Sequence, residues 1–136
     1  MRGHSGDRLP DYLIGVQRMI SEDDAQRIAE EWISAWNRHD LDAIVGHYAD
    51  DIVSFSPLAM TRLGIPDDKI EGKERLRSYF AGGLEAAGNL HFELQRVLIG
   101  VEGMAIYYVR ENGKHVADVM TLNDACKVTT ARVFHS

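Results

Sequence analysis

Apolar side chains between residues 25 and 37 recur at steps of three and four positions. This spacing places them on one broad face of an α-helix, together with both tryptophans of the chain, Trp32 and Trp36. Ser21 precedes the pattern, and Asp24 stands three residues after Ser21, an arrangement typical of a helix N-terminus. We therefore predict a first helix that begins after Ser21 and buries its tryptophan face.

The same periodicity predicts two further helices. Asp40 can cap the second helix, whose apolar positions are Leu41, Ile44, Val45 and Tyr48. The third helix begins near Lys73, and its apolar stripe consists of Leu76, Tyr79, Phe80 and Leu84. Between these two helices, residues 52–55 form a short strand that ends at Pro57, because proline cannot continue a ladder. Residues 57–71 show no periodic spacing of hydrophobic residues. We predict that they form the longest loop, a candidate lid or binding loop.

The remainder of the chain shows the patterning of β-strands. Four strands are predicted, and three hairpins in succession make them an antiparallel meander over residues 90–99, 104–111, 114–122 and 127–135. Asn112 and Gly113 tolerate the positive φ of a type I′ turn. We therefore predict a two-residue turn that pairs Glu111 with Lys114.

This register determines which side chains share a face of the sheet. It places Tyr107 directly opposite Asp118. Their face also carries Ala105, Val109, Val116, Met120 and Leu122. The other face carries Ile106, Tyr108, Arg110, His115, Ala117, Val119 and Thr121.

Three N-terminal helices followed by a long antiparallel sheet indicate an α+β fold. We predict a conical, barrel-like domain in which the three helices pack in the concave face of a highly curved, mostly antiparallel sheet. Such a fold leaves a conical cavity suited to a small ligand. Aromatic residues must line part of that cavity, and the candidates are Trp32, Trp36, Tyr48, Phe55, Tyr79 and Phe80.

Length and composition restrict the domain organisation. The 136 residues, of which 45% are hydrophobic, correspond to one domain with a buried core. Residues 1–18 contain a short apolar patch without a convincing cleavage site, so we predict a flexible N-terminal extension and a single domain over residues 19–136. No apolar run approaches the ~20 residues that a membrane helix needs.

Charge and cysteine content restrict the partners. Lys and Arg number 15 against 21 Asp and Glu, and the resulting net charge of −6 argues against nucleic acid and an anionic membrane. The single cysteine, Cys126, cannot form an internal disulfide, and no group of Cys and His has the spacing of zinc ligands. We expect a cytoplasmic protein that holds neither a metal nor a cofactor.

Asp118 is the main candidate for chemistry. Burial among apolar side chains raises the pKa of a carboxyl group, and a protonated Asp can donate a hydrogen bond at neutral pH. Tyr107, predicted opposite Asp118, could donate to the same ligand oxygen and complete a two-donor site for developing negative charge. The alternatives are that Asp118 faces water at a strand edge and that the ring of Tyr107 belongs to the core.

His135 is a third candidate catalytic residue, on condition that the last turn comprises the four residues 123–126. Asp118 then pairs with Ala131, and His135 faces the cavity. A turn of three or five residues would direct His135 away from the cavity. The candidate ligand contacts on these two strands are Val116, Met120 and Val133.

Three segments resemble a known family: WISAWNRHDLDAI at residues 32–44, HYADDI at residues 47–52 and GKERLRSYF at residues 72–80. They resemble the SnoaL-like branch of the nuclear transport factor 2-like superfamily, which includes ketosteroid isomerases and polyketide cyclases. The likeness extends from about residue 22 to residue 135. It implies the conical α+β fold, and it implies no single activity, because the scaffold also serves dehydratases, epoxide hydrolases and members without known chemistry.

The resemblance to ketosteroid isomerases carries over unevenly. The protonated aspartate of their oxyanion hole corresponds to Asp118. Their partner tyrosine on the first helix falls at Trp32, whose indole N–H can donate, and the supporting tyrosine of the second helix is matched by Tyr48. Their general base, an aspartate before a proline, falls at Ser56, which precedes Pro57. Serine cannot abstract a proton unaided, so this departure argues against steroid isomerisation.

Three functions remain open. An isomerase, cyclase or lyase would use Asp118 for acid–base chemistry on a small, largely apolar carbonyl compound. A protein without catalysis would bind such a ligand in the same cavity, which Ser56 at the position of the base favours. A dimerisation domain would join two copies through an outer sheet face that includes Ile106, Tyr108, Ala117 and Val119, and such a homodimer is compatible with either other function.

Overall fold

The computed structural model describes residues 19–57 and 69–136. Within these residues the elements are α2 (Glu22–Asn37), α3 (Leu41–Val45), β1 (Tyr48–Phe55), β2 (Lys69–Glu71), α5 (Lys73–Ala86), β3 (Phe92–Gly100), β4 (Gly103–Arg110), β5 (His115–Leu122) and β6 (Val128–His135). The predicted α+β class and the C-terminal meander are confirmed. The extension predicted at residues 1–18 and most of the loop predicted at residues 57–71 lie outside the described residues.

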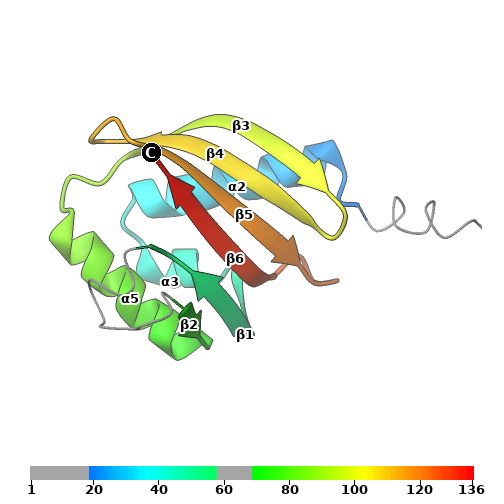
Figure 1. Ribbon diagram of the computed structural model, residues 1–136, viewed down its shortest axis with the longest axis horizontal. Coiled ribbons are helices and arrows are strands. Elements are labelled where there is room, and N and C mark those ends of the chain that lie inside the picture. Colours follow the sequence, from blue (N-terminus) through cyan, green and yellow to red (C-terminus); the bar gives the residue numbers. More distant parts are fainter. Residues whose placement is uncertain (1–18, 58–68) are drawn as a thin grey trace, which may run out of the picture.

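The strands form one curled sheet in the order β2-β1-β6-β5-β4-β3, and its two edges do not join into a closed barrel. All neighbouring strands are antiparallel except β1 and β6, which run parallel. Figure 1 shows α2 passing behind the sheet and α5 lying beside β1 and β2. The core therefore lies between the concave face of the sheet and the helices, as the fold prediction requires.

The first two helices begin where the sequence predicts. Ser21 Oγ accepts a hydrogen bond of 3.1 Å from the backbone N–H of Asp24, and Asp40 Oδ1 accepts one of 3.1 Å from the N–H of Ala43. These side-chain oxygens satisfy N–H groups that have no partner within the helix. The buried residues of α2 are Ala25, Ile28, Ala29, Trp32, Ile33, Ala35 and Trp36, the stripe that the periodicity predicts.

Two predictions in the middle of the chain are wrong. Tyr48 does not extend the second helix, because α3 ends at Val45 and Tyr48 begins β1, where it pairs with Val128 of β6. The end of the predicted loop is the strand β2, whose Ile70 pairs with Ser54 of β1. The strand conformation of both segments depends on pairing with residues elsewhere in the chain rather than on a local pattern.

The turn between β4 and β5 is one residue longer than predicted. The backbone N–H of Arg110 donates to the carbonyl of Lys114, and the N–H of Gly113 donates to the carbonyl of Arg110, both over 2.9 Å. Gly113 has a φ of 83°, a left-handed conformation that glycine adopts without strain. Three residues, 111–113, therefore connect the strands, which is typical of a hairpin with a bulge at its glycine.

The longer turn changes the register of β4 against β5. Asp118 pairs with Ile106, and Tyr107 pairs with Ala117. Ile106 and Tyr108, predicted on the outer face, are therefore buried on the concave face with Asp118. Tyr107 lies on the outer face.

The register of β6 differs from the prediction without changing its faces. Asp118 pairs with Val133 rather than Ala131, and a local irregularity lies between Thr121 and Leu122. The shift amounts to two residues, and side chains alternate with a period of two, so His135 stays on the face of Asp118 as predicted.

No group of three or more His, Cys, Asp and Glu side chains within residues 19–57 and 69–136 could hold a metal ion. No helix in that part of the chain is long and apolar enough to cross a membrane.

The β3–β4 hairpin gives a test of sheet packing. A Cβ atom at Gly103 would lie 2.1 Å from the carbonyl oxygen of Met120, whereas one at Gly100 would meet nothing within 4 Å. We expect Gly103→Ala to lower the free energy of unfolding by about 2 kcal/mol, because the backbone of β5 must move. Urea denaturation measures this loss, and Gly100→Ala is the matched control. Equal stability of the two variants would contradict the close approach of β4 and β5.

Candidate functional site

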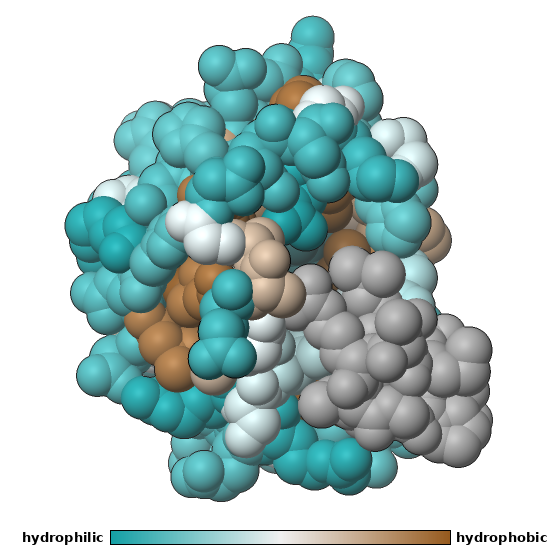
Figure 2. Space-filling view, turned by 90° about the vertical axis from the view of Figure 1, so that its left-hand side faces the viewer, coloured by the Kyte–Doolittle hydropathy of each residue, from teal (hydrophilic) through white to brown (hydrophobic). Residues whose placement is uncertain are grey.

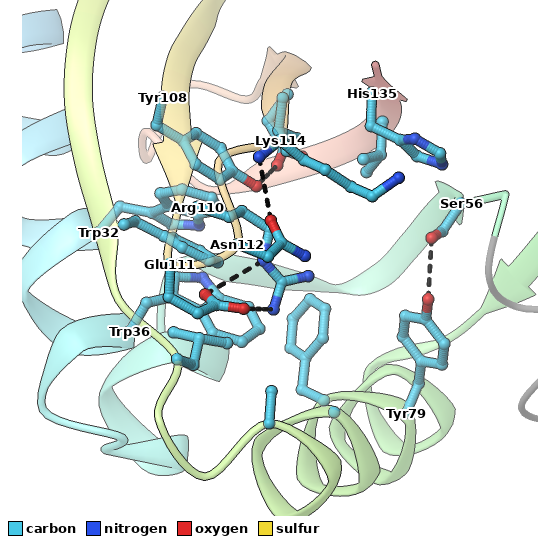
Figure 3. A pocket seen from close by; sticks show the side chains of 18 of the residues that line it. Trp32, Trp36, Ser56, Tyr79, Tyr108, Arg110, Glu111, Asn112, Lys114 and His135 are labelled. Carbon is cyan, nitrogen blue, oxygen red and sulfur yellow. Dashed lines mark hydrogen bonds and ion pairs between the residues drawn. The ribbon is translucent and has the colours of Figure 1, made fainter.

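A cavity of about 370 Å³ opens at one end of the concave face. Its wall combines side chains from α2, β1, α5 and the four C-terminal strands. Figure 2 shows this end of the molecule, where hydrophobic surface is surrounded by hydrophilic residues. In Figure 3, Trp32 and Trp36 lie on one side of the cavity, and Ser56 and Tyr79 face each other on the opposite side. The volume is sufficient for a small ring compound.

Asp118 lies in the cavity wall and is only 5% exposed. Its Oδ2 accepts a hydrogen bond of 3.0 Å from the hydroxyl of Tyr108. Burial raises the pKa of Asp118 to about 7, and the hydrogen bond from Tyr108 opposes this shift in part. Near neutral pH the carboxyl group therefore exists in both protonation states.

Tyr48 supplies a second polar group at the same end of the cavity. Its hydroxyl accepts a hydrogen bond of 3.0 Å from the indole Nε1 of Trp32. Burial raises the pKa of Tyr48, and the charge of Asp118 raises it further. Burial and Asp118 likewise raise the pKa of Tyr108. Both phenols therefore remain protonated, and the hydroxyl of Tyr48 can donate to a ligand while it accepts from Trp32.

This arrangement can polarise and protonate an oxygen. Below pH 7 the protonated Asp118 and the hydroxyl of Tyr48 are both donors, which suits a carbonyl oxygen or an enolate. Above pH 7 the ionised Asp118 is a proton acceptor in an apolar site. One carboxyl group with a pKa near neutrality can therefore act either as acid or as base.

Within the described part of the chain, Ser56 forms a hydrogen bond with a tyrosine hydroxyl. Its Oγ lies 2.8 Å from the hydroxyl oxygen of Tyr79, and either group can donate. Ser56 is 7% exposed and contributes to the cavity wall. A hydroxyl pair of this kind can bind a ligand oxygen, but it provides no general base.

Charged side chains from the β4–β5 turn lie at the mouth of the cavity. Arg110 and Glu111 form an ion pair of 3.1 Å between Nη2 and Oε2. Glu111 also accepts a hydrogen bond from the backbone N–H of His91. Lys114 and the exposed His135 complete this rim. In Figure 3, Arg110 and Lys114 reach toward the space between Trp32 and Ser56.

Most of the residues predicted to contact a ligand lie in the cavity wall, namely Trp32, Trp36, Tyr48, Ser56, Tyr79, Phe80, Val116 and Val133. The candidates Asp118 and His135 lie there too. Phe55 does not, because β1 directs it to the outer face, where the guanidinium of Arg132 lies 4.2 Å from its ring centre. Met120 is buried in the core outside the cavity wall.

The predicted pairing of Tyr107 with Asp118 is wrong. The hydroxyl of Tyr107 lies 2.6 Å from Nδ1 of His115, and the two rings stack on the outer face. Tyr108 takes the place predicted for Tyr107, because the three-residue turn moves every side chain of β4 to the opposite face.

Sequence reasoning missed several residues of the cavity wall, namely Ser54, Leu90, Phe92, Tyr108, Arg110, Glu111, Asn112 and Lys114. The predicted two-residue turn places Tyr108 and Arg110 on the wrong face of the sheet. The glycine at position 113 was the only local signal for a longer turn, and it fits both turn lengths. Phe92 lies within a correctly predicted strand, but no local pattern indicates that its side chain is on the concave face of the sheet.

The curled sheet over α2, α3 and α5, with a cavity at its open end, defines a class of small α+β proteins. Residues 29–130 match the sequence model of the SnoaL-like domain. The crystal structure of a SnoaL-like protein of unknown function from Burkholderia thailandensis is 36% identical, with a TM-score of 0.83, and the alignment covers 86% of this chain and 98% of that chain. The chain belongs to the SnoaL-like family.

More distant structures share the fold. A candidate polyketide cyclase from Sinorhizobium meliloti is 13% identical, with a TM-score of 0.67 over 85% of this chain and 100% of that chain. A candidate ketosteroid isomerase from Kribbella flavida is 14% identical, with a TM-score of 0.66 over 84% of this chain and 78% of that chain. At these identities the likeness concerns the fold alone. Comparison with proteins of curated function gives no match.

The buried Asp118 makes stability depend on pH. In the unfolded chain the carboxyl ionises near pH 3.8, whereas the folded protein keeps the proton up to about pH 7. Between these values the native state binds more protons than the unfolded state, so the free energy of unfolding falls as pH rises and levels off above pH 7. Ionisation of Asp118 over this range lowers the free energy of unfolding by roughly 4 kcal/mol. The substitution Asp118→Asn abolishes this dependence on pH.

We therefore expect the stability of Asp118→Asn, measured relative to the wild type, to be greater at about pH 8 than at about pH 5. Urea denaturation of both proteins at the two pH values measures the gain. The amide oxygen of the variant can still accept from Tyr108, so the variant retains that hydrogen bond. A stability difference that stays constant with pH would show that Asp118 is ionised throughout this range.

Proposed function

We propose that the protein binds a small, largely apolar carbonyl compound in the cavity and transfers a proton through Asp118. The observation that carries this proposal is a carboxyl group that is buried in a cavity wall, accepts a hydrogen bond from Tyr108 and has a pKa of about 7. A group with this pKa can both take up and release a proton near neutral pH. Isomerase, cyclase and lyase reactions all need such a step.

The proposed reaction consists of two proton transfers through Asp118. The ionised Asp118 takes a proton from the carbon next to the carbonyl group of the ligand, which gives a neutral Asp118 and an enolate. Tyr48 donates to the enolate oxygen and accepts from Trp32, which fixes the orientation of its hydroxyl. Asp118 then returns the proton to another carbon or oxygen of the same molecule. This reaction needs no second base, so it is compatible with a serine, Ser56, at the position of the general base of ketosteroid isomerases.

The second candidate is a binding protein without catalysis. It is favoured by the Ser56–Tyr79 pair, which offers a hydrogen bond to a ligand but no acid or base. This protein would hold the same class of ligand with the same donors. The two candidates differ in whether protons of the bound ligand exchange.

Proton exchange tests the catalytic proposal. We expect the protein to accelerate exchange of the α-protons of trans-1-decalone with D₂O, and Asp118→Asn to reduce this acceleration at least ~100-fold. Proton NMR measures the exchange, and a binding titration shows whether the variant still holds the ketone. Asp124→Asn, in the exposed turn before β6, is the matched control and should keep the wild-type rate. Saturable binding without accelerated exchange would identify the binding protein instead.

We further propose that two copies associate through the outer face of the sheet. Leu98, Val119 and Phe134 are 56%, 42% and 58% exposed, and the strand register places all three on this face. Large exposed apolar residues on one surface are typical of an interface. Of the residues predicted for this interface, Val119 carries the proposal, whereas Ile106 and Tyr108 lie on the concave face.

Phe134→Asp tests this association. A charge buried in an apolar interface costs desolvation energy, so we expect at least a tenfold weaker dimer. Analytical ultracentrifugation measures the dissociation constant, with Gln26→Asp on the exposed side of α2 as the control. A monomeric wild type at micromolar concentration would remove the proposal.

A further inference from the structure

Ser54 contributes a hydroxyl group to the cavity that the proposed function does not use. The residue lies in the cavity wall and is 4% exposed. Within residues 19–57 and 69–136, its hydroxyl group forms no hydrogen bond. Its oxygen keeps some accessible surface, because the one enclosed side-chain nitrogen or oxygen without a partner among these residues is Nε1 of Trp36. A molecule in the cavity can therefore reach the hydroxyl of Ser54.

The strand register places Ser54 on the concave face of β1, between two apolar residues. Ser54 pairs with Ile70 of β2 and with Ala131 of β6, which are 0% and 1% exposed. Neither of these side chains can donate or accept a hydrogen bond. An unpaired hydroxyl in an apolar environment costs free energy, and alanine would fit here without this cost. Packing therefore explains the small size of the residue at this position but not its hydroxyl group.

Ser54 and Asp118 face the cavity from two strands that are separated by β6. Ser54 pairs with Ala131, and Ala131 pairs with Met120, which stands two residues after Asp118 on β5. With strands about 4.8 Å apart and residues about 3.4 Å apart along a strand, the two Cα atoms would lie about 12 Å apart in a flat sheet. The curl of the sheet shortens this separation, and both residues line the same cavity (Figure 1). Oxygens bound at Asp118 and at Ser54 therefore belong to different parts of one ligand.

The surroundings of Ser54 favour a neutral ligand group. Its two paired neighbours are uncharged, and the ion pair of Arg110 with Glu111 belongs to the β4–β5 turn at the mouth of the cavity. When Asp118 is ionised, its charge opposes a second anion in the cavity. A hydroxyl group of the ligand suits this position, because it can accept a hydrogen bond from Ser54 or donate one to it.

We propose that Ser54 is a ligand-binding residue, and that the cavity takes ring ketones with a hydroxyl group at a position separate from the carbonyl group. This inference rests on the proposed function, because the carbonyl oxygen is the one bound by Tyr48 and Asp118. The apolar ring between the two oxygens contacts the aromatic part of the wall, where Trp32 and Phe92 lie 6.0 Å apart between ring centres. Polar contacts at two positions fix the orientation of a ligand in a mostly apolar pocket.

A set of matched ketones tests the inference. The compound 1-tetralone carries the carbonyl group alone, whereas 5-hydroxy-1-tetralone and 7-hydroxy-1-tetralone each add one hydroxyl group to the same ring system. The compounds differ in hydration, so the quantity to compare between protein variants is the ratio of the dissociation constants of 1-tetralone and each hydroxyketone. We expect the wild type to prefer at least one hydroxyketone. We expect Ser54→Ala to reduce this preference about fivefold to tenfold, the usual effect of one lost hydrogen bond.

Two further variants control for other effects of the substitution. Ser78→Ala makes the same chemical change on the exposed side of α5, outside the cavity wall, and should leave the ratio unchanged. Ser54→Cys keeps a side chain of similar shape with a much weaker donor, so it should lose the preference as well. This second variant decides the question if Ser54→Ala fails to fold.

Urea denaturation separates a ligand-binding role of Ser54 from a structural role. The hydroxyl has no partner within the described part of the chain, so we expect Ser54→Ala to be at least as stable as the wild type. A lower free energy of unfolding would show that the hydroxyl stabilises the protein itself, and it would contradict the inference.

The binding outcomes distinguish this inference from the proposed function. If 1-tetralone binds and the wild type prefers neither hydroxyketone, or if both Ser54 variants keep the preference, the inference is overturned and the proposed function stands. Absence of binding of 1-tetralone at millimolar concentration would instead contradict the proposed function itself.

Discussion

The turn between β4 and β5 determines what the cavity contains. Its three residues and the left-handed Gly113 set the pairing of Asp118 with Ile106. A turn shorter by one residue would exchange the two faces of β4 and bring Tyr107 and Val109 into the core. The polar floor of the cavity would then lose Tyr108, and the mouth would lose Arg110. The chemical character of the site therefore depends on one local backbone conformation.

The fold also has to compensate for a carboxyl group among aromatic rings. Phe92 stacks on Tyr108 at 4.3 Å between ring centres, and Trp32 lies 5.5 Å from Tyr108. These contacts hold the hydroxyl of Tyr108 against Asp118. Water is kept from most of the group, and the acid stays neutral at a pH at which exposed carboxyl groups are ionised. The same packing thus both raises the pKa of Asp118 and lowers the stability of the protein at neutral pH.

Features that depend on local hydrophobic periodicity could be predicted from the sequence. Features that depend on how distant strands pair could not. Helix α2, its Ser21 cap and the meander follow from spacing and capping chemistry alone. Asp118 could be recognised because a carboxylate stands in the middle of an apolar strand. Tyr48 could not be placed, because Tyr48 fits the helical spacing locally and its strand conformation comes from Val128, far along the chain. Tyr108 was missed because Asn112-Gly113 is compatible with turns of two and three residues.

The parallel pairing of β1 with β6 has a consequence for folding. It joins Ser54 to Ala131, which are separated by more than half of the chain. Closing such a long loop carries an entropy cost that must be met before the contact stabilises anything, so pairings of this kind form slowly. The helices and the β3–β4–β5 hairpins can assemble from contacts between near neighbours. The cavity wall contains Ser56, which follows β1, and Val133 of β6. We therefore expect the cavity to be among the last parts of the protein to form.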